Sequence, residues 1–159
     1  MNIVTERTDE LRELYRELIL DHARSPRHFG TLATVTHTAE GVNPLCGDKL
    51  KIYFEVDADG NIADAAFEGS GCAISVASAS LLTDTVIGLP TQEALAYFSA
   101  VVGALSGSPV VSQAAEIDLG KLKALEGVRE YPSRVKCATL AWHAMNAAIQ
   151  RGDQSVSTE

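Results

Sequence analysis

The chain of 159 residues has only three cysteines, and no two of them form a Cys-x-x-Cys pair. Structural zinc sites usually carry such pairs, and an odd number of cysteines does not suit a disulfide framework. The sequence also lacks internal repeats and any linker that would separate two domains. Its length and its apolar content of 46% therefore predict a single folded domain over residues 1–150. Residues 151–159 are polar and rich in Ser and Thr, and we expect a disordered tail there.

Long apolar runs and a surplus of positive charge are missing as well. No apolar run is long enough to cross a bilayer, and no leading basic and apolar segment is present. We therefore expect a cytoplasmic protein with no membrane partner, in a reducing compartment where disulfides are rare. The formal net charge of −8 argues against a nucleic-acid partner, because phosphate binding needs a basic surface or stripe.

The local sequence around each of the three cysteines predicts an exposed sulfur atom. Cys46 lies in a Pro/Gly turn, NPLCGD at 43–48, just before a predicted strand. Cys72 follows a Gly-Ser-Gly stretch, and Cys137 falls in the first turn of a predicted helix. Together with Asp48 they offer four donors, the number that a tetrahedral zinc site takes. Three unrelated cysteines are the alternative, because free cysteine is commonly a small buried apolar residue.

Basic residues flank two of the three cysteines. They are Lys49, Lys51, Arg129, Arg134 and Lys136. Their field would favour thiolate, the form that binds metal or attacks sulfur, although a solvated charged face explains them as well. Ser133 is a plausible N-cap, which would place Cys137 near the positive end of a helix dipole and favour thiolate there too.

Apolar periodicity predicts several helices and a small antiparallel sheet. Helices are expected over 8–24, 73–85, 92–105 and 133–150, with a short helical piece near 119–125. Strands are expected over 31–40, as an edge strand, and over 49–56 and 62–68. The last two form a hairpin through the turn at 57–61, and this pairing carries Cys46 toward Cys72. For His22 and His28, which straddle the end of the first helix, we expect surface or capping roles.

Several stretches resemble the NifU/IscU-like iron–sulfur assembly proteins. The first two are LYRELILDHARSPR at 14–27 and NPLCGD at 43–48. Two more, GCAISVASAS at 71–80 and RVKCATLAW at 134–142, narrow the similarity to the SufU branch. The resemblance extends over residues 11–149, and the number and order of the stretches make it specific.

Three departures from IscU proteins favour the SufU branch. IscU proteins carry a histidine directly before the third cysteine, where this chain has Lys136. They also carry a Leu-Pro-Pro-Val-Lys chaperone-recognition stretch, where this chain reads EYPSR at 130–134. The segment 106–122 resembles the extra length that SufU chains have over IscU.

The resemblance implies an α+β fold with a small antiparallel sheet of about three strands packed against several helices. It implies a zinc ion held by Cys46, Asp48, Cys72 and Cys137. It further implies that Cys46 accepts persulfide sulfur from a SufS-type, pyridoxal-phosphate-dependent cysteine desulfurase, whose histidine takes the vacated position at the zinc. Arg134 would assist near the site, and downstream Suf assembly proteins would receive the sulfur.

Two alternatives to a zinc-dependent sulfurtransferase follow from the same residues. The first is a scaffold on which a two-iron, two-sulfur cluster is built on the four donors and passed to apo-proteins, since thiolates are the usual cluster ligands. The second is a structural zinc protein that binds partners, which the missing Cys-x-x-Cys pairs disfavour. Lys136 in place of the IscU histidine favours the sulfurtransferase.

Overall fold

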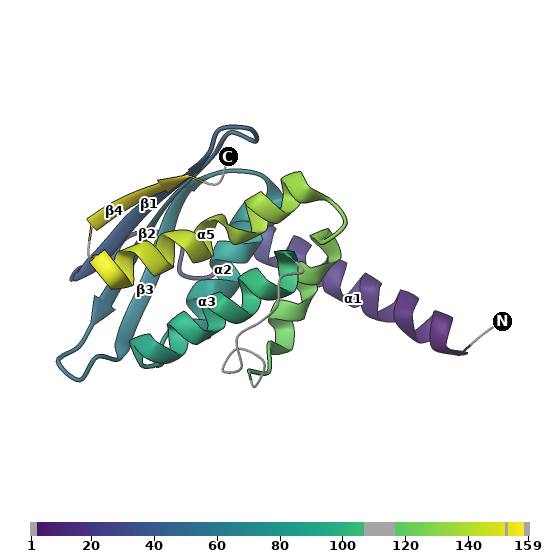
Figure 1. Cartoon of the computed structure of the whole chain (residues 1–159), viewed down its shortest axis with the longest axis horizontal. Helices are drawn as coiled ribbons and strands as arrows, with labels where there is room; N and C mark the ends of the chain where they lie inside the picture. Colours follow the sequence, from purple (N-terminus) through teal and green to yellow (C-terminus); the bar gives the residue numbers. More distant parts are fainter. Residues whose placement is uncertain (1–2, 107–116, 152, 158–159) are drawn as a thin grey trace.

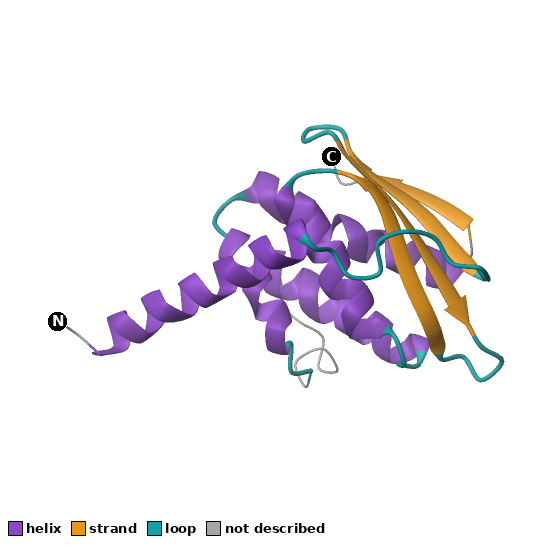
Figure 2. Cartoon of the chain, turned by 180° about the vertical axis from the view of Figure 1, so that it is seen from behind, coloured by secondary structure: helices purple, strands orange, loops and turns teal. Residues whose placement is uncertain are grey.

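The computed structural model describes residues 3–106, 117–151 and 153–157, and it shows an α+β fold, as expected (Figure 1). The helices are α1 (Ile3–Arg24), α2 (Ala73–Val86), α3 (Thr91–Ser106), the 3-10 helix η1 (Gly120–Val128) and α5 (Pro132–Arg151). The strands are β1 (His37–Asn43), β2 (Asp48–Val56), β3 (Ile62–Ser70) and β4 (Asp153–Ser157). Helices cover one face of the sheet, and the other face carries no helix in the described part of the chain (Figure 2).

The sheet has the order β3-β2-β1-β4. The first three strands are antiparallel, as predicted, and β4 adds to β1 in parallel. Two expectations are thereby corrected. The tail is not disordered over Asp153–Ser157, and β1 is not an edge strand because β4 pairs with it. The tail's polar composition does not reveal this pairing, which depends on the backbone N–H and C=O groups that β1 offers at its open side.

Strand β2 is the centre of the core. Leu50, Ile52 and Phe54 have no exposed surface, whereas Lys49 and Lys51, on either side of Leu50, are exposed. This alternation is the pattern of a strand with one face against helices and the other toward solvent. The buried face meets α5, which contributes Trp142 to the same apolar core.

Helix α2 packs closely against α5 because its buried positions carry small residues. Ser78 Oγ accepts a 3.0 Å hydrogen bond from Trp142 Nε1 and donates a 2.5 Å bond to the carbonyl of Ala138. Ser75 Oγ donates to the carbonyl of Cys137 at 3.4 Å. Ser78 thus gives the buried Nε1–H of Trp142 its acceptor, and Ser75 joins the first turn of α2 to α5 at Cys137.

Helix α1 projects from the body of the protein at its N-terminal end and joins the core at its C-terminal end (Figures 1 and 2). There His22, expected at the surface, is 2% exposed, and its Nδ1 lies 2.7 Å from Ser80 Oγ. Helical spacing places it on the same face as Leu18 and Ile19, so packing against α2 buries it. Among the helices that the structure describes, none has both the length and the apolar character to cross a membrane.

Candidate functional site

The turn between β1 and β2 presents Cys46 to solvent. Asn43 and Asp48 form the last pair of the β1–β2 register, so the four residues between them make the turn. The backbone N–H of Cys46 donates to the carbonyl of Asn43 at 3.1 Å, and Gly47 takes a φ of 70°. Glycine adopts this left-handed conformation without strain, which lets the chain reverse between Cys46 and Asp48. The thiol of Cys46 is exposed.

Asp48 is a buried carboxylate with one oxygen satisfied and one not. The residue is 2% exposed, and its Oδ1 accepts a 2.8 Å hydrogen bond from the backbone N–H of Cys72. Its Oδ2 is buried with no hydrogen-bond partner among the described residues. The approach of Asp48 depends on Gly71, where an added Cβ would lie 2.7 Å from Oδ1. A buried, unpaired carboxylate oxygen is costly unless a cation or proton meets it, so the geometry suits a metal ligand.

The structure brings the predicted donors together from three distant segments. One ligand atom each of Cys46, Asp48 and Cys137 lies within 4.8 Å of the other two. Cys72 is not part of that set of three, but its backbone N–H donates to Asp48, and its thiol is among the groups that raise the pKa of Cys137. Its Sγ also lies 3.7 Å from Ser75 Oγ. The hairpin register, which pairs Lys49 with Ser70, carries the Cys46 turn to the start of α2 as the sequence predicted.

Cys137 differs from its prediction, because it is fully buried instead of exposed. It is the sixth residue of α5 and faces α2 and the sheet, with no solvent beside it. Burial raises the pKa of its thiol well above the usual value, and Asp48, Cys46 and Cys72 add to the rise. Proximity to the start of a helix therefore does not decide the protonation state here, since loss of hydration is the larger effect. A cation among these donors would reverse this balance.

Two of the flanking basic residues, Lys49 and Lys51, interact with groups other than the cysteines. Lys49 pairs with Glu40 at 3.2 Å, and Lys51 lies 5.6 Å from the ring centre of Tyr53. Arg134 is exposed in the first turn of α5, where its backbone N–H donates to the carbonyl of Tyr131 at 2.8 Å. For the two lysines, the solvated-face interpretation fits better. The assisting role of Arg134 stays a prediction.

Asn43 is a site residue that the sequence analysis missed. It has no exposed surface, and its Nδ2 donates a hydrogen bond to Cys137 Sγ at 3.6 Å, across 94 positions of sequence. Its Oδ1 is buried without a partner in the described part of the chain. An asparagine before Pro44 looks like turn chemistry in the sequence. The signal that could have pointed to it is its position as the last residue of a strand leading into the Cys46 turn.

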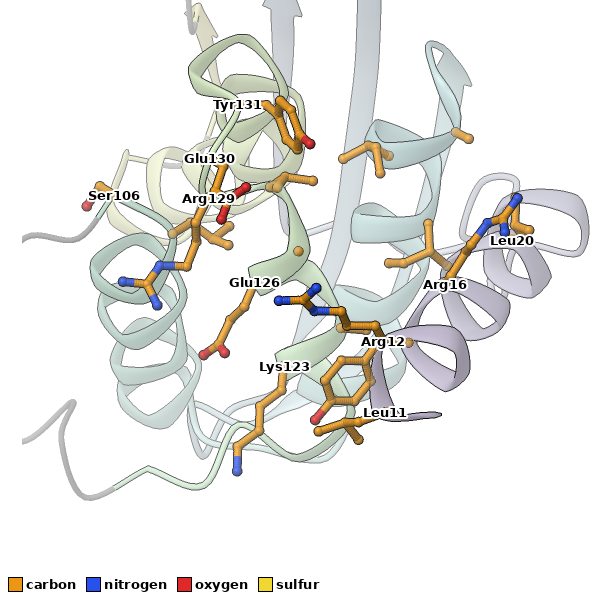
Figure 3. Close-up of a pocket in the computed structure, with 18 residues that line it drawn as sticks. Leu11, Arg12, Arg16, Leu20, Ser106, Lys123, Glu126, Arg129, Glu130 and Tyr131 are labelled. Atoms are coloured by element: carbon orange, nitrogen blue, oxygen red, sulfur yellow. The ribbon is translucent and has the colours of Figure 1, made fainter. Parts of the chain in front are cut away.

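An open groove of about 1080 Å³ lies beside the site (Figure 3). Its walls come from α1, η1 and the segment before α5, and it reaches Ala73 and Ile74, the first residues of α2 after Cys72. Both apolar and charged side chains line the groove. The charged residues are Arg12, Arg16, Lys123, Glu126, Arg129 and Glu130.

Residues 14–138 match the NifU-like N terminal domain. The chain belongs to this NifU-like family. It is 40% identical over 142 residues to a Streptococcus pyogenes protein named as the iron–sulfur cluster assembly scaffold protein IscU, covering 89% of this chain and 86% of that protein. It is 38% identical over 141 residues to the zinc-dependent sulfurtransferase SufU of Bacillus subtilis, covering 89% and 92%. The crystal structure of FiSufU from Fervidobacterium islandicum AW-1 superposes with a TM-score of 0.76 at 33% identity, covering 84% and 95%.

The donor set of this NifU-like chain fits a metal ion. Thiolates and a carboxylate are zinc ligands, and thiolates also hold iron–sulfur clusters. The buried, unpaired Oδ2 of Asp48 and the space that Gly71 leaves beside Oδ1 are the features of the structure that agree with such a site.

Proposed function

We propose that this chain is a zinc-dependent sulfurtransferase of iron–sulfur cluster assembly, which accepts persulfide sulfur on Cys46 from a SufS-type cysteine desulfurase. The observation that carries the proposal is the pairing of one exposed thiol, Cys46, with the buried donors Asp48 and Cys137 within 4.8 Å. The name of the Bacillus subtilis relative, a zinc-dependent sulfurtransferase, supports it. We place the protein in the cytoplasm.

Cys46, Asp48, Cys72 and Cys137 would hold the zinc. When bound, zinc keeps thiols deprotonated and protects them from oxidation without any redox activity of its own. The four residues differ in how far a partner can reach them. Cys46 is exposed, Cys72 is half-buried and Cys137 is buried, so the partner meets Cys46 first.

In the transfer step the Cys46 thiolate attacks the outer sulfur of the desulfurase persulfide. A sulfur–sulfur bond forms on Cys46, and the sulfur–sulfur bond of the partner breaks. The partner's cysteine leaves as a thiolate, so no external oxidant or reductant is needed, as in thiol–disulfide exchange. The turn is suited to this step because Gly47 lets Cys46 sit at its outer edge while Asp48 stays buried. Arg134, exposed on the adjacent helix start, would stabilise the developing thiolate charge.

The partner would also contact the groove beside Cys72. Its apolar lining and its four basic residues suit a protein surface with apolar and acidic side chains. Downstream Suf assembly proteins would then take the sulfur from Cys46.

The deciding experiment measures activation of a SufS-type desulfurase together with mass analysis of the acceptor. Wild-type protein should raise desulfurase turnover and gain one sulfur atom on the peptide that carries Cys46. Cys46→Ser should lose both. A Cys46→Ser variant that activates the desulfurase as well as the wild type would refute the role of Cys46 as the acceptor.

A second candidate function is a scaffold on which an iron–sulfur cluster is assembled. The 40% identity to a protein named IscU scaffold favours it, and the thiols at the site are cluster ligands. Anaerobic reconstitution with iron and sulfide distinguishes the two. A stable, transferable chromophore that forms in preference to zinc binding would favour the scaffold.

A further inference from the structure

We propose that Asn43 is a positioning residue for the cysteine and aspartate donors, acting on Cys137 through an N–H···S hydrogen bond. This inference rests on the proposed function, because it concerns the same site. Asn43 touches three of the four proposed ligand residues. Its side chain bonds Cys137 Sγ, its carbonyl accepts from the backbone N–H of Cys46, and its backbone pairs with Asp48.

The side-chain contact is suited to a coordinating sulfur. Cys137 has no exposed surface, so water cannot solvate charge on its sulfur. The Nδ2 of Asn43, at 3.6 Å, supplies a polar donor in place of water. A thiolate sulfur can only accept hydrogen bonds, so an amide N–H is the group that it requires.

The side-chain oxygen of Asn43 indicates that folding alone does not explain the bond between Nδ2 and the Cys137 sulfur. Oδ1 is buried and lacks a hydrogen-bond partner among the residues described. An apolar residue of the same shape would avoid that unsatisfied group and would serve a purely structural role better. The unpartnered Oδ1 therefore destabilises the fold. The bond from Nδ2 to the Cys137 sulfur is the contact that accounts for an asparagine at this position.

The backbone of Asn43 extends this role to the turn. The backbone N–H of Cys46 donates to the carbonyl of Asn43, with 3.1 Å between nitrogen and oxygen, and this bond ties the turn to the end of β1. A residue that orients ligands in this way, without binding the metal itself, belongs to the outer shell of a site. Loss of such a residue typically weakens metal binding by about 10–100-fold.

The test uses two variants of the full chain, with zinc alone and cobalt(II) alone as probes. Asn43→Leu keeps the shape of the side chain and removes both the donor and the unsatisfied oxygen. Asn43→Asp keeps the shape and replaces the donor by a carboxylate oxygen. Asn146→Asp is the matched control, because Asn146 lies on α5 and its Oδ1 accepts a hydrogen bond from Gln150 Nε2, away from the sulfur atoms.

For Asn43→Leu we expect metal-free protein at least as heat-stable as the wild type, but zinc binding weakened by about 10–100-fold in competition with a chelator. The sulfur-to-cobalt charge-transfer band should move to longer wavelength, since the sulfur loses its hydrogen bond. Asn43→Asp should also bind zinc more weakly, and Asn146→Asp should match the wild type. Zinc affinity within twofold of the wild type, with an unmoved cobalt band, would overturn the inference.

Two further outcomes are decisive. Should both Asn43 variants fail to fold, the side-chain amide signals of Asn43 in wild-type protein take their place. These signals should shift and exchange more slowly with solvent on addition of zinc, and signals that do not respond overturn the inference. Wild-type protein that binds no zinc overturns the proposed function together with this inference, whereas normal zinc binding by all variants overturns this inference alone.

Discussion

The backbone N–H of Cys72 donates a 2.8 Å hydrogen bond to Oδ1 of Asp48, a residue 24 positions earlier in the chain. This bond joins the start of α2 to the start of β2 and leaves Oδ2 without a hydrogen-bond partner among the described residues, in a carboxylate that has an oxygen within 4.8 Å of ligand atoms of Cys46 and Cys137. One carboxylate therefore has a structural oxygen and an oxygen available to a ligand.

Replacing Asp48 by Asn tests that division. The amide oxygen can still accept from Cys72, but the anionic donor is lost, so the fold should persist while zinc affinity falls by about tenfold or more. Chelator competition measures the affinity, and thermal unfolding of metal-free protein measures the fold. Unchanged zinc affinity would show that Oδ2 is not a ligand.

Gly71→Ala should displace Asp48. The new Cβ would lie 2.7 Å from Asp48 Oδ1 and 3.2 Å from the Cβ of Ser75, so one of them must move. We expect the free energy of unfolding to fall by about 1–3 kcal/mol, as is typical of overpacking. The matched control is Gly127→Ala in η1, where, among the described residues and apart from the adjoining backbone, no atom lies within 4 Å of the added Cβ. Denaturant unfolding of both variants measures the difference, and equal stabilities would contradict the crowding seen at Gly71.

Ser78→Ala should weaken the contact between α2 and α5. The substitution leaves the Nε1–H of Trp142 buried without its acceptor, which should reduce the free energy of unfolding by about 1–3 kcal/mol. The control is Ser25→Ala at the exposed position that follows α1, where the change should be below about 0.5 kcal/mol. A smaller loss for Ser78→Ala than for the control would contradict the assigned role of the serine.

Stability should decline as the pH falls below about 6.5, the usual pKa of histidine. Burial lowers the pKa of His22 and of His143 in the folded protein, so the unfolded chain binds protons first. The stabilisation from the neutral rings is complete above the unfolded pKa and is lost as the pH falls toward the folded values. Unfolding measured at a series of pH values should show this slope, and His22→Asn and His143→Asn should each flatten it. A double variant with the full wild-type slope would exclude these two rings as its source.

Alkylation of the metal-free protein should follow the exposure of the three thiols. Iodoacetamide should modify Cys46 first and Cys72 more slowly, while Cys137 should react only in denaturant because it is buried and its pKa is raised. Peptide mass analysis after timed quenching gives the order. Prior addition of zinc should protect Cys46, and rapid labelling of Cys137 in the native state would contradict its burial.

The sequence predicted the fold well because its strands and helices have clear periods. The alternation around Leu50 and Ile52 and the turn at 57–61 were enough to pair β2 with β3. The structure departs from the predictions where a residue's environment depends on distant segments. The helical period around Cys137 did not show that this residue faces α2. The polar composition of the tail did not show that it pairs with β1. Asn43 escaped notice for the same reason, since its partner lies 94 positions away.

The spread of the donor atoms along the chain also affects when the site can exist. The turn at Cys46 and the hairpin can form before α5 is synthesised, and Cys137 lies on α5. A ribosome-bound fragment that stops before α5 lacks Cys137, the most buried of the three cysteines. Such a fragment cannot bind an ion with all four donors. Binding of one ion by all four donors is therefore possible only after α5 has been synthesised and has packed against the sheet.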